Sequence, residues 1–443
     1  MKISTDKKKI VKNTLIILLW LLVWQAVSLI VSNKIVIVGP VEVLIALCKS
    51  VVKLDFYKSV GGSLLRIGSG FLVAFALGTV LGGIAYGVPF IKDLLKPFVT
   101  ALKSVPVASF VVILLIWFGA DNLSFYVSML VVFPIIYINT CEGFGATDDK
   151  LKETAEVFGL SFKDKLIYVY RDSVMPYIKS AVKTSFGMAW KSGVAAEVIG
   201  LPDYSLGAGI YRAKIYLETA DLFAWTVAVI LLSIICELTV LVLLHLSDRI
   251  RVCPKGSGNK IDKNPANIKL ENITAGYGDF RVIDNMSLDL TPGICYEIHG
   301  ASGVGKTTLL KEIYRRSDVT KSVMFQENRL LEEYDGLTNV VLCARGYTKE
   351  ECKKIALRIL PEEFLNKPVK TYSGGMKRRV ALLRALCHDS DMFLLDEPFT
   401  GLDDETKEKA TELITDMCRD SVLCLVTHEA CGIKTEQIIL EKR

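Results

Sequence analysis

The sequence lacks the residue patterns that hold a transition metal or a disulfide framework. Its 443 residues include 11 cysteines but no C-x-x-C pair, and its 4 histidines form no pair at the spacing of a zinc site. The cysteines are expected to be small apolar side chains in a reduced compartment. The pattern therefore argues against a zinc-bound or disulfide-held fold.

The chain also has little net charge. It carries 53 Lys and Arg against 48 Asp and Glu, a formal net charge of +5. Membrane topology accounts for its few basic clusters, so the charge does not predict a nucleic-acid partner.

Hydrophobic residues, in contrast, are abundant and unevenly distributed. They make up 51% of the sequence, and the mean hydropathy is +0.38. Long uncharged runs lie in the first half, whereas the second half mixes both signs of charge as soluble domains do. A chain of this length is expected to hold two or three domains. The distribution predicts a membrane domain followed by a soluble domain.

Six runs in the first half are close to the roughly 20 residues needed to cross a bilayer. A signal peptide is the alternative for the first run, because a Lys-rich start also precedes secretory signals. That run is too long for a typical signal core and has no obvious cleavage site, which favours a retained span. The expected spans are 13–33, 67–91, 104–120, 122–141, 174–198 and 222–246.

Six spans place both ends of the membrane domain on the same side of the bilayer. Lys-rich residues 2–12 and the basic residues after 247 place that side in the cytosol. The charged loop 142–173 is then cytosolic as well. Glu237, within the last run, is either a residue of the transport pathway or interface, or a carboxylate paired near the cytosolic end.

A glycine-rich loop at 300–308 reads G-A-S-G-V-G-K-T-T and stands between an expected strand and an expected helix. This is the phosphate-loop pattern in the context that it requires. Its backbone N–H groups would surround phosphate groups, Lys306 would add a positive charge, and the Thr307 hydroxyl would bind Mg²⁺. The expected nucleotide-binding residues of this loop are Gly300, Ser302, Gly303, Gly305, Lys306, Thr307 and Thr308.

Two carboxylates end a second apolar strand at 392–395. Asp396 is expected to reach Mg²⁺, and Glu397 is expected to polarise the attacking water as a general base. Pro398 follows directly, so the strand ends there.

A further glycine pair opens a basic helical run at 373–386. Ser373, Gly374 and Gly375 would present N–H groups to a second phosphate contact. The stretch S-G-G-M resembles the signature motif of ABC transporters, with Met376 in place of the usual Gln. The resemblance implies that Ser373 and Gly375 contact ATP bound to the phosphate loop of an opposing domain.

The same family resemblance assigns four further residues by order and spacing. Tyr277 matches the aromatic residue that stacks on adenine. Gln326 matches the residue that senses Mg²⁺ and the membrane domain, and Asp403 matches the loop that crosses the dimer. His428 matches the switch histidine that contacts the γ-phosphate. His299 has no family role and is expected to be structural.

The cytosolic loop carries an amphipathic pattern at 148–162. Apolar side chains recur at helical spacing between charged ones, so this helix either lies on the membrane or docks on a partner. The nucleotide domain later in the chain favours docking. Glu153, Ala155 and Gly159 resemble the E-A-A loop of binding-protein-dependent ABC importers, although Arg171-Asp172 replaces the first Leu-Pro usual in the related branch.

Other membrane-domain stretches resemble the nitrate, sulfonate and taurine branch of these importers. They include Ser63 to Arg66, Ser104 to Pro106, Trp117 to Gly119 and Ala195 to Glu197. The expected fold is an all-α six-helix transmembrane domain (1–247), a linker (248–266) and an α/β P-loop ATPase domain (267–443). Only about twenty residues separate Lys306 from Gln326, fewer than is usual in the family.

The predicted function is ATP-driven import of a small solute across a prokaryotic cell membrane, with the ATPase domain in the cytoplasm. The resemblance implies ATP and Mg²⁺ as cofactors, a homodimer, and an external substrate-binding protein that delivers a nitrate-, sulfonate- or taurine-like anion or a vitamin precursor. The alternatives are an ABC exporter half-transporter and a membrane-bound regulatory ATPase. Loss of uptake on deleting the binding protein would separate import from both.

Overall fold

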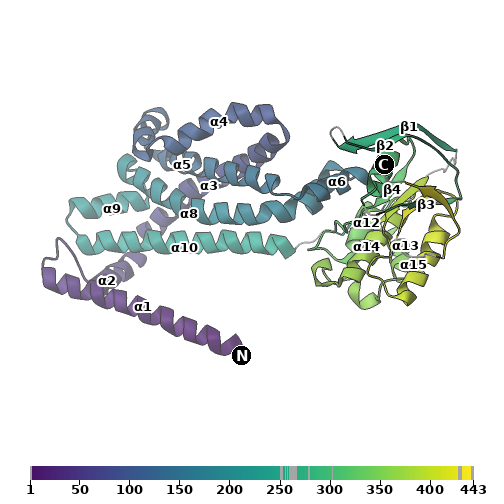
Figure 1. The fold of residues 1–443 in the computed structure, drawn as a ribbon. Coiled ribbons are helices and arrows are strands. Elements are labelled where there is room, and N and C mark those ends of the chain that lie inside the picture. The colour runs from purple at the N-terminus through teal and green to yellow at the C-terminus, as the bar shows by residue number, and fades with distance from the viewer. Residues whose placement is uncertain are drawn as a thin grey trace. The chain divides into compact units, whose positions relative to one another are not determined.

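The structure is a computed structural model that describes residues 2–249, 253–254, 256, 258, 267–277, 280–301, 303–427 and 432–440 (Figure 1). For residues 2–10, 248, 249, 277 and 280 only the backbone is described. The chain divides into two units, Met1–Ala146 with Ser173–Ile250, and Thr147–Asp172 with Arg251–Arg443. The loop predicted to couple the two domains therefore belongs to the second unit.

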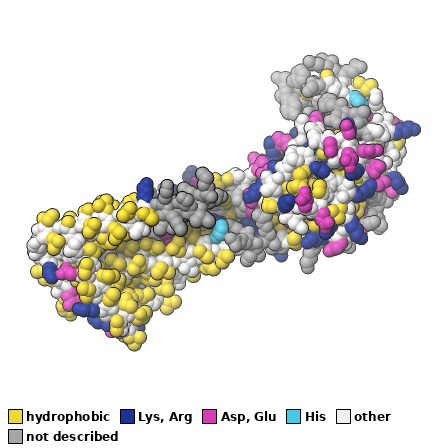
Figure 2. Space-filling view, turned by 90° about the horizontal axis from the view of Figure 1, so that it is seen from below, with side chains coloured by type: hydrophobic (Ala, Val, Ile, Leu, Met, Phe, Trp, Pro, Cys, Tyr) yellow, Lys and Arg dark blue, Asp and Glu magenta, His cyan; other side chains and the backbone are white. Residues whose placement is uncertain are grey.

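The first unit is entirely helical in its described part. Four of its helices are long and apolar enough to cross a membrane, over Val11–Val31, Leu54–Gly87, Val107–Gly145 and Thr219–Ser247. Hydrophobic side chains cover most of the visible face of this unit (Figure 2). Its helices are α1 (Lys2–Val31), α2 (Pro40–Val51), α3 (Leu54–Gly87), α4 (Pro89–Ser104), α5 (Val107–Gly145), α8 (Arg171–Gly200), α9 (Leu206–Ile215) and α10 (Thr219–Arg249).

The helical membrane domain is confirmed, and the six expected runs fall on α1, α3, α5, α8 and α10. The third and fourth runs are the two parts of α5, which the non-helical conformation of Gly119 (φ 73°, ψ 175°) divides. The fifth run lies in α8, whose Lys179, Lys183 and Lys191 keep it outside the four apolar helices. Glu237 lies half-buried in α10, and its role stays a prediction.

Small residues hold α3 close to α5. A Cβ atom at Gly70 would lie 2.4 Å from the carbonyl oxygen of Phe125, and one at Gly82 would lie 2.9 Å from that of Tyr137. Such close approach of two backbones is the usual role of glycine between membrane helices. The glycine-rich run therefore packs against another helix of the same unit.

The second unit contains a five-stranded parallel sheet in the order β4-β5-β6-β3-β7 and a separate antiparallel pair, β1-β2. Both signs of charge are mixed over its visible face (Figure 2). Its strands are β1 (Ile268–Tyr277), β2 (Phe280–Leu290), β3 (Cys295–His299), β4 (Lys321–Met324), β5 (Met392–Asp396), β6 (Val422–Val426) and β7 (Thr435–Ile439). Its helices after β3 are α11 (Lys306–Arg316), α12 (Gly336–Cys343), α13 (Lys349–Ala356), α14 (Gly374–Leu386) and α15 (Asp404–Met417), with 3-10 turns at Glu362–Phe364 and Val369–Thr371.

The sheet is buried on both faces. Strand β5 (Met392–Asp396) and strand β6 (Val422–Val426) consist of fully buried residues, as expected for central parallel strands. Strand β6 separates β3 from β5, and all three end at the same edge of the sheet. Ligands of open α/β sheets bind at the carboxyl ends of the strands. The parallel sheet therefore brings the segments after β3 and β5 to a shared edge.

The segment 147–172 differs from its prediction. Instead of one helix over 148–162, it forms α6 (Asp149–Val157), α7 (Phe162–Asp164) and a π-helical turn (Lys165–Tyr170). Helix α6 begins at Asp148, whose side chain accepts a hydrogen bond from Lys150 N, and it ends before Gly159, which has a φ of 60°. This left-handed conformation stops an α-helix and favours glycine. Most of the predicted linker 248–266 lies outside the described residues.

Candidate nucleotide site and coupling segment

The phosphate-loop residues follow β3 and run into the first turn of α11, so the predicted strand-loop-helix order is present. Gly305 has a φ of 104°, and a Cβ atom there would lie only 2.2 Å from Val282 Cγ1. A Cβ at Gly300 would lie 2.6 Å from Val304 Cγ1. A side chain at either position would clash with these valines, so the conformation of the loop requires glycine there. Ser302 lies outside the described residues.

Lys306 is 8% exposed, and its ammonium group is held by the loop itself. Nζ donates to the carbonyl oxygens of Gly300 (2.8 Å) and Ala301 (3.3 Å). Among the described residues its hydrogen bonds go to neutral carbonyls, with the Asp396 carboxylate as a charged neighbour. Its N–H groups and positive charge suit a phosphate oxygen. The loop therefore fits a phosphate-bearing ligand, with Thr308 following in the first turn of α11.

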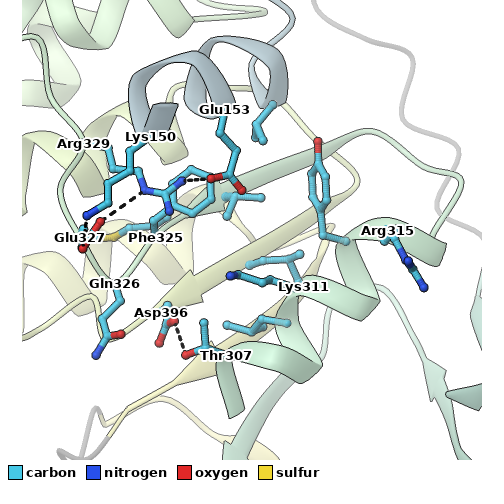
Figure 3. A pocket seen from close by; sticks show the side chains of 16 residues that line it. Lys150, Glu153, Thr307, Lys311, Arg315, Phe325, Gln326, Glu327, Arg329 and Asp396 are labelled. Atoms are coloured by element: carbon cyan, nitrogen blue, oxygen red, sulfur yellow. Dashed lines mark hydrogen bonds and ion pairs between the residues drawn. The ribbon is translucent and has the colours of Figure 1, made fainter. Parts of the chain in front are cut away.

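Thr307 and Asp396 meet across the carboxyl edge of the sheet (Figure 3). Thr307 Oγ1 donates to Asp396 Oδ2 at 2.9 Å, and Asp396 is 4% exposed. Burial raises the pKa of the Asp396 carboxyl, and the Thr307 hydrogen bond opposes that shift. Hydroxyl and carboxylate oxygens are the ligands that Mg²⁺ prefers, with water and phosphate oxygens completing its shell. This donor pair fits Mg²⁺ shared with a bound nucleotide.

Glu397 directly follows β5 in a strained conformation. Its φ is 52°, which is uncommon for a residue other than glycine. Its N–H donates to the carbonyl oxygen of Val426 (2.8 Å), and its Oε2 accepts from Thr400 Oγ1 (3.2 Å). The half-buried carboxylate follows the carboxyl end of β5, next to Asp396, where it can act as a base on a water molecule.

The signature residues begin α14, with Ser373 as its N-cap. Ser373 Oγ accepts a hydrogen bond from Met376 N at 3.3 Å. A Cβ at Gly375 would lie 2.4 Å from the carbonyl oxygen of Gly401. The signature residues therefore lie against the loop that leads to Asp403. Asp403 is exposed, and hydrogen bonding to Thr406 lowers its pKa.

Two further predicted residues cannot be placed. His428 lies outside the described residues, and only the backbone of Tyr277 is described, at the end of β1. Gln326 follows β4 and lines the same cavity as Thr307 and Asp396 (Figure 3). His299 lies 3.1 Å from the Glu297 carboxylate, in agreement with a structural role.

Arg378 is a residue that the sequence analysis missed. It is 4% exposed, and its guanidinium donates to the carbonyl oxygens of Gln326 (2.8 Å) and Glu397 (3.0 Å), as well as to that of Asp396. Burial lowers its pKa to about 10. The side chain ties together the segments after β4 and β5. Its only sequence signal is a run of three basic residues at the start of a helix, which solvent-exposed helices also show.

The segment 147–172 packs on the nucleotide-binding domain within the second unit. Arg329 Nη1 lies 2.7 Å from Glu153 Oε2, and Lys150 Nζ lies 2.7 Å from Glu327 Oε1. Phe158 is 5% exposed, with its ring 5.2 Å from that of His388. Ala155, from the predicted coupling motif, is 1% exposed. The predicted docking of this loop is therefore observed, with an apolar and an ionic part.

A cavity of about 510 Å³ joins the docked helix to the nucleotide site. Figure 3 shows Lys150, Glu153 and Arg329 at one end, and Thr307 and Asp396 at the other, with Gln326 beside them. Both ends belong to the second unit, so the predicted coupling segment and the predicted Mg²⁺ ligands share one cavity.

Comparisons with known families match both parts of the chain. Residues 74–252 match the family described as binding-protein-dependent transport system inner membrane component. Residues 283–332 and 318–400 match the ABC transporter family.

Individual proteins resemble the chain as well. An aliphatic sulfonates import ATP-binding protein (SsuB 2) of Pseudomonas syringae pv. syringae is 37% identical over 193 residues, which is 40% of this chain and 68% of the relative. One from Mesorhizobium japonicum is 33% identical over 40% of this chain and 77% of its own length. A solved dimeric structure of a bacterial ABC transporter cassette is 25% identical over 39% of this chain and 94% of its own, with a TM-score of 0.35.

Two domains of one transport system are thus present in a single polypeptide. Its ATP-binding domain hydrolyses ATP, and this hydrolysis is coupled to transport by the membrane domain. The chain belongs to the ABC transporter family, as a permease of the binding-protein-dependent import type fused to its own ATPase.

Proposed function

We propose that this chain imports a small sulfonate-like organic anion across a prokaryotic cell membrane, as a homodimer served by an external substrate-binding protein. The relatives named as aliphatic sulfonate import proteins support the cargo class. The description of the membrane-domain family supports a binding protein. The observation that carries the proposal is the docking of segment 147–172 on the nucleotide-binding domain, because ATP-driven import needs such a connection.

We infer that each copy of the chain binds one ATP with Mg²⁺. The phosphate loop from Gly300 to Thr308, with Ser302 among its members, would hold the phosphates, and Tyr277 would stack on the base. Thr307, Gln326 and Asp396 would hold Mg²⁺, which neutralises phosphate charge during phosphoryl transfer. These assignments rest on the cradle around Gly305, the buried ammonium of Lys306 and the paired oxygens of Thr307 and Asp396.

Glu397 is proposed to act as the general base, with His428 and Asp403 supporting the same site. The strained backbone at Glu397 supports this role, because such strain is often held at functional positions. Arg378 positions the two carboxylate-bearing residues by binding their carbonyl oxygens.

The homodimer is proposed from the position of the signature residues. Ser373 and Gly375 present a helix start next to Gly401, in a different element from the phosphate loop of their own chain. A second copy would bring its own Ser373, Gly374 and Gly375 over that loop. Two composite ATP sites would form, and their closure would move Glu153, Ala155 and Gly159 with the coupling segment.

The proposal is tested with the full chain in proteoliposomes. A candidate binding protein is added on the side of the bilayer opposite the ATPase domains. ATP-dependent movement of labelled taurine or an alkanesulfonate into the compartment that the ATPase domains face is then measured. Uptake should require the binding protein, ATP and Mg²⁺. Movement only in the opposite direction would support an exporter and would overturn the proposal.

The Glu397→Gln substitution tests whether Glu397 is the general base for ATP hydrolysis. Nucleotide binding should be retained, while steady-state ATP hydrolysis falls at least about 100-fold, as expected for loss of a general base. Glu408→Gln, an exposed carboxylate on α15, serves as the control. A near-normal rate of ATP hydrolysis in Glu397→Gln would contradict the assignment of Glu397 as the general base.

A further inference from the structure

Two sequence stretches of the membrane domain, Ser63 to Arg66 and Ala195 to Glu197, meet at a buried hydrogen-bond network. Ser63 lies in α3 and Glu197 in α8, and both side chains are 0% exposed. Ser63 Oγ donates to Glu197 Oε2 at 2.7 Å. The two residues are 134 positions apart in the sequence, so the contact is purely tertiary.

The network holds the start of α9. Leu206 N donates to Ser63 Oγ at 2.9 Å, and Gly207 N donates to Glu197 Oε2 at 3.2 Å. The first N–H groups of a helix have no partner within the helix, and a carboxylate near them is stabilised by the helix dipole. Gly207 has no room for a side chain, since a Cβ there would lie 2.4 Å from Glu197 Cβ. The first turn of α9 therefore lies against the Glu197 carboxylate.

The turn between α8 and α9 is strained and is held by the same face of α3. Leu201 and Tyr204 have φ values of 53° and 48°. Arg66 donates to the carbonyl oxygens of Asp203 (3.0 Å) and Tyr204 (3.4 Å). A Cβ at Gly62 would lie 2.2 Å from the Tyr204 carbonyl oxygen. Strained residues persist only where their surroundings hold them in place.

The Ser124 hydroxyl of α5 lies beside the same carboxylate and interacts with it. Within the described residues, neither Ser124 Oγ nor Glu197 Oε1 has the geometry of a full hydrogen bond. The Glu197 carboxylate of α8 therefore lies where side chains or backbone of α3, α5 and α9 meet.

The topology predicted from the sequence puts this turn on the external side, because the loop 142–173 before α8 is expected in the cytosol and 174–198 is an expected span. Helix α8 starts at the end of segment 147–172, which packs on the ATPase domain. Its 30 residues span about 45 Å, more than the roughly 30 Å of the bilayer core. The turn 201–205 after α8 then lies on the side from which cargo arrives.

We propose that Ser63, Arg66 and Glu197 are positioning residues for import, which clamp the turn 201–205 and α9 at the external end of the membrane domain. The proposal rests on the proposed import function. The clamp holds the external segment 201–215 in the conformation that receives cargo. It is released when the membrane domain changes the side of access, and it takes no part in ATP hydrolysis.

The test uses the full chain in nanodiscs with Ser63→Ala and Glu197→Ala. Hydrogen exchange of the amides in 201–215 should be at least about tenfold faster, because each variant removes buried hydrogen bonds. ATP hydrolysis stimulated by the binding protein should fall at least about tenfold, while basal hydrolysis stays within about twofold. Ser69→Ala, an exposed hydroxyl two turns along α3 that bonds only to the Arg66 carbonyl oxygen among the described residues, should change neither.

Substitutions of Arg66 provide a second test, which applies even if the Ser63 and Glu197 variants do not fold. Arg66→Ala should raise exchange in 201–215 and lower stimulated hydrolysis, and Arg66→Lys, which keeps donors for the two carbonyl oxygens, should restore both. Unchanged exchange in 201–215, or a parallel loss of basal and stimulated hydrolysis, would overturn the clamp. The exchange measurement needs no cargo, so a wild-type protein that imports nothing would refute the import function and leave the clamp to be judged separately.

Discussion

Arg329 Nη1 lies 2.7 Å from Glu153 Oε2, across 176 positions of sequence. Arg329 also lies 3.8 Å from the Glu327 carboxylate, and its guanidinium is stacked 3.8 Å above the Phe325 ring. Both neighbours flank Gln326, the predicted Mg²⁺ sensor. The ion pair therefore fixes the coupling helix to the segment that carries this residue.

Reversing the charge at Glu153 tests that connection. Glu153 is half exposed in this pair, although Arg329 is 12% exposed. A pair open to solvent on one side contributes about 1 kcal/mol, so Glu153→Gln should reduce uptake less than about fivefold. Glu153→Arg faces two cations toward each other and should reduce uptake at least about tenfold, with basal ATP hydrolysis retained. Glu156→Arg on the same helix is the control. Full uptake by Glu153→Arg would show that the pair has no part in coupling.

The apolar part of the docking surface depends on Phe158. Its ring is 5% exposed and lies 5.4 Å from the Arg384 guanidinium, whereas Phe162 is 80% exposed. Burying one aromatic side chain contributes about 1.5–3 kcal/mol. Phe158→Asp should therefore abolish uptake while sparing part of the ATP hydrolysis, and Phe162→Asp should leave uptake near normal. Equal effects of the two changes would mean that 147–172 is only a surface segment.

Removing Arg378 should disturb both the nucleotide site and the stability of its domain. Arg378→Leu leaves the carbonyl oxygens of Gln326, Asp396 and Glu397 without this donor. An unsatisfied buried group costs about 1–3 kcal/mol, and each kcal/mol lowers the unfolding midpoint of a domain of this size by about 2–4 °C. ATP hydrolysis should fall as well. Lys377→Gln, which removes a pair with Glu332 at the surface, should shift the midpoint far less, as thermal unfolding in detergent would measure.

His388 gives a pH dependence with a defined sign. It is 7% exposed, its Nδ1 lies 2.7 Å from the Cys343 carbonyl oxygen, and burial lowers its pKa, with Arg345 and Asp389 as charged neighbours. Below the unfolded pKa of about 6.5, the unfolded chain binds a proton that the folded chain does not. Stability contributed by neutral His388 is thus present above that pH and is lost as pH falls through it.

The measurement compares unfolding free energies at pH 7.5 and 5.5. The wild type should lose up to about 1.4 kcal/mol per pH unit from this group, and His388→Gln should lose correspondingly less. A variant with the full wild-type slope would assign the pH dependence to other residues.

The spacing of residues in the sequence predicted those features that depend on neighbouring residues alone. The glycines at 300–305 and the carboxylates at 396–397 stand beside strands whose apolar runs are continuous, and the structure places them at the ends of β3 and β5. The membrane runs were recognisable by length alone. The break between α6 and α7 was missed, because the left-handed conformation of Gly159 alone decides that the helix ends there.

By itself, then, the amino-acid sequence determined the phosphate loop, the order of the domains and the amphipathic pattern of the segment predicted to couple them, since these follow from short-range periodicity and spacing. Only the tertiary structure decided that Glu153 meets Arg329, that Arg378 binds three backbone carbonyls, and that Ser63 and Glu197 close on α9. The physical reason is burial. A charged or hydroxyl side chain has the same appearance in sequence whether it faces solvent or a partner far along the chain, and the packing of helices and strands alone selects between the two.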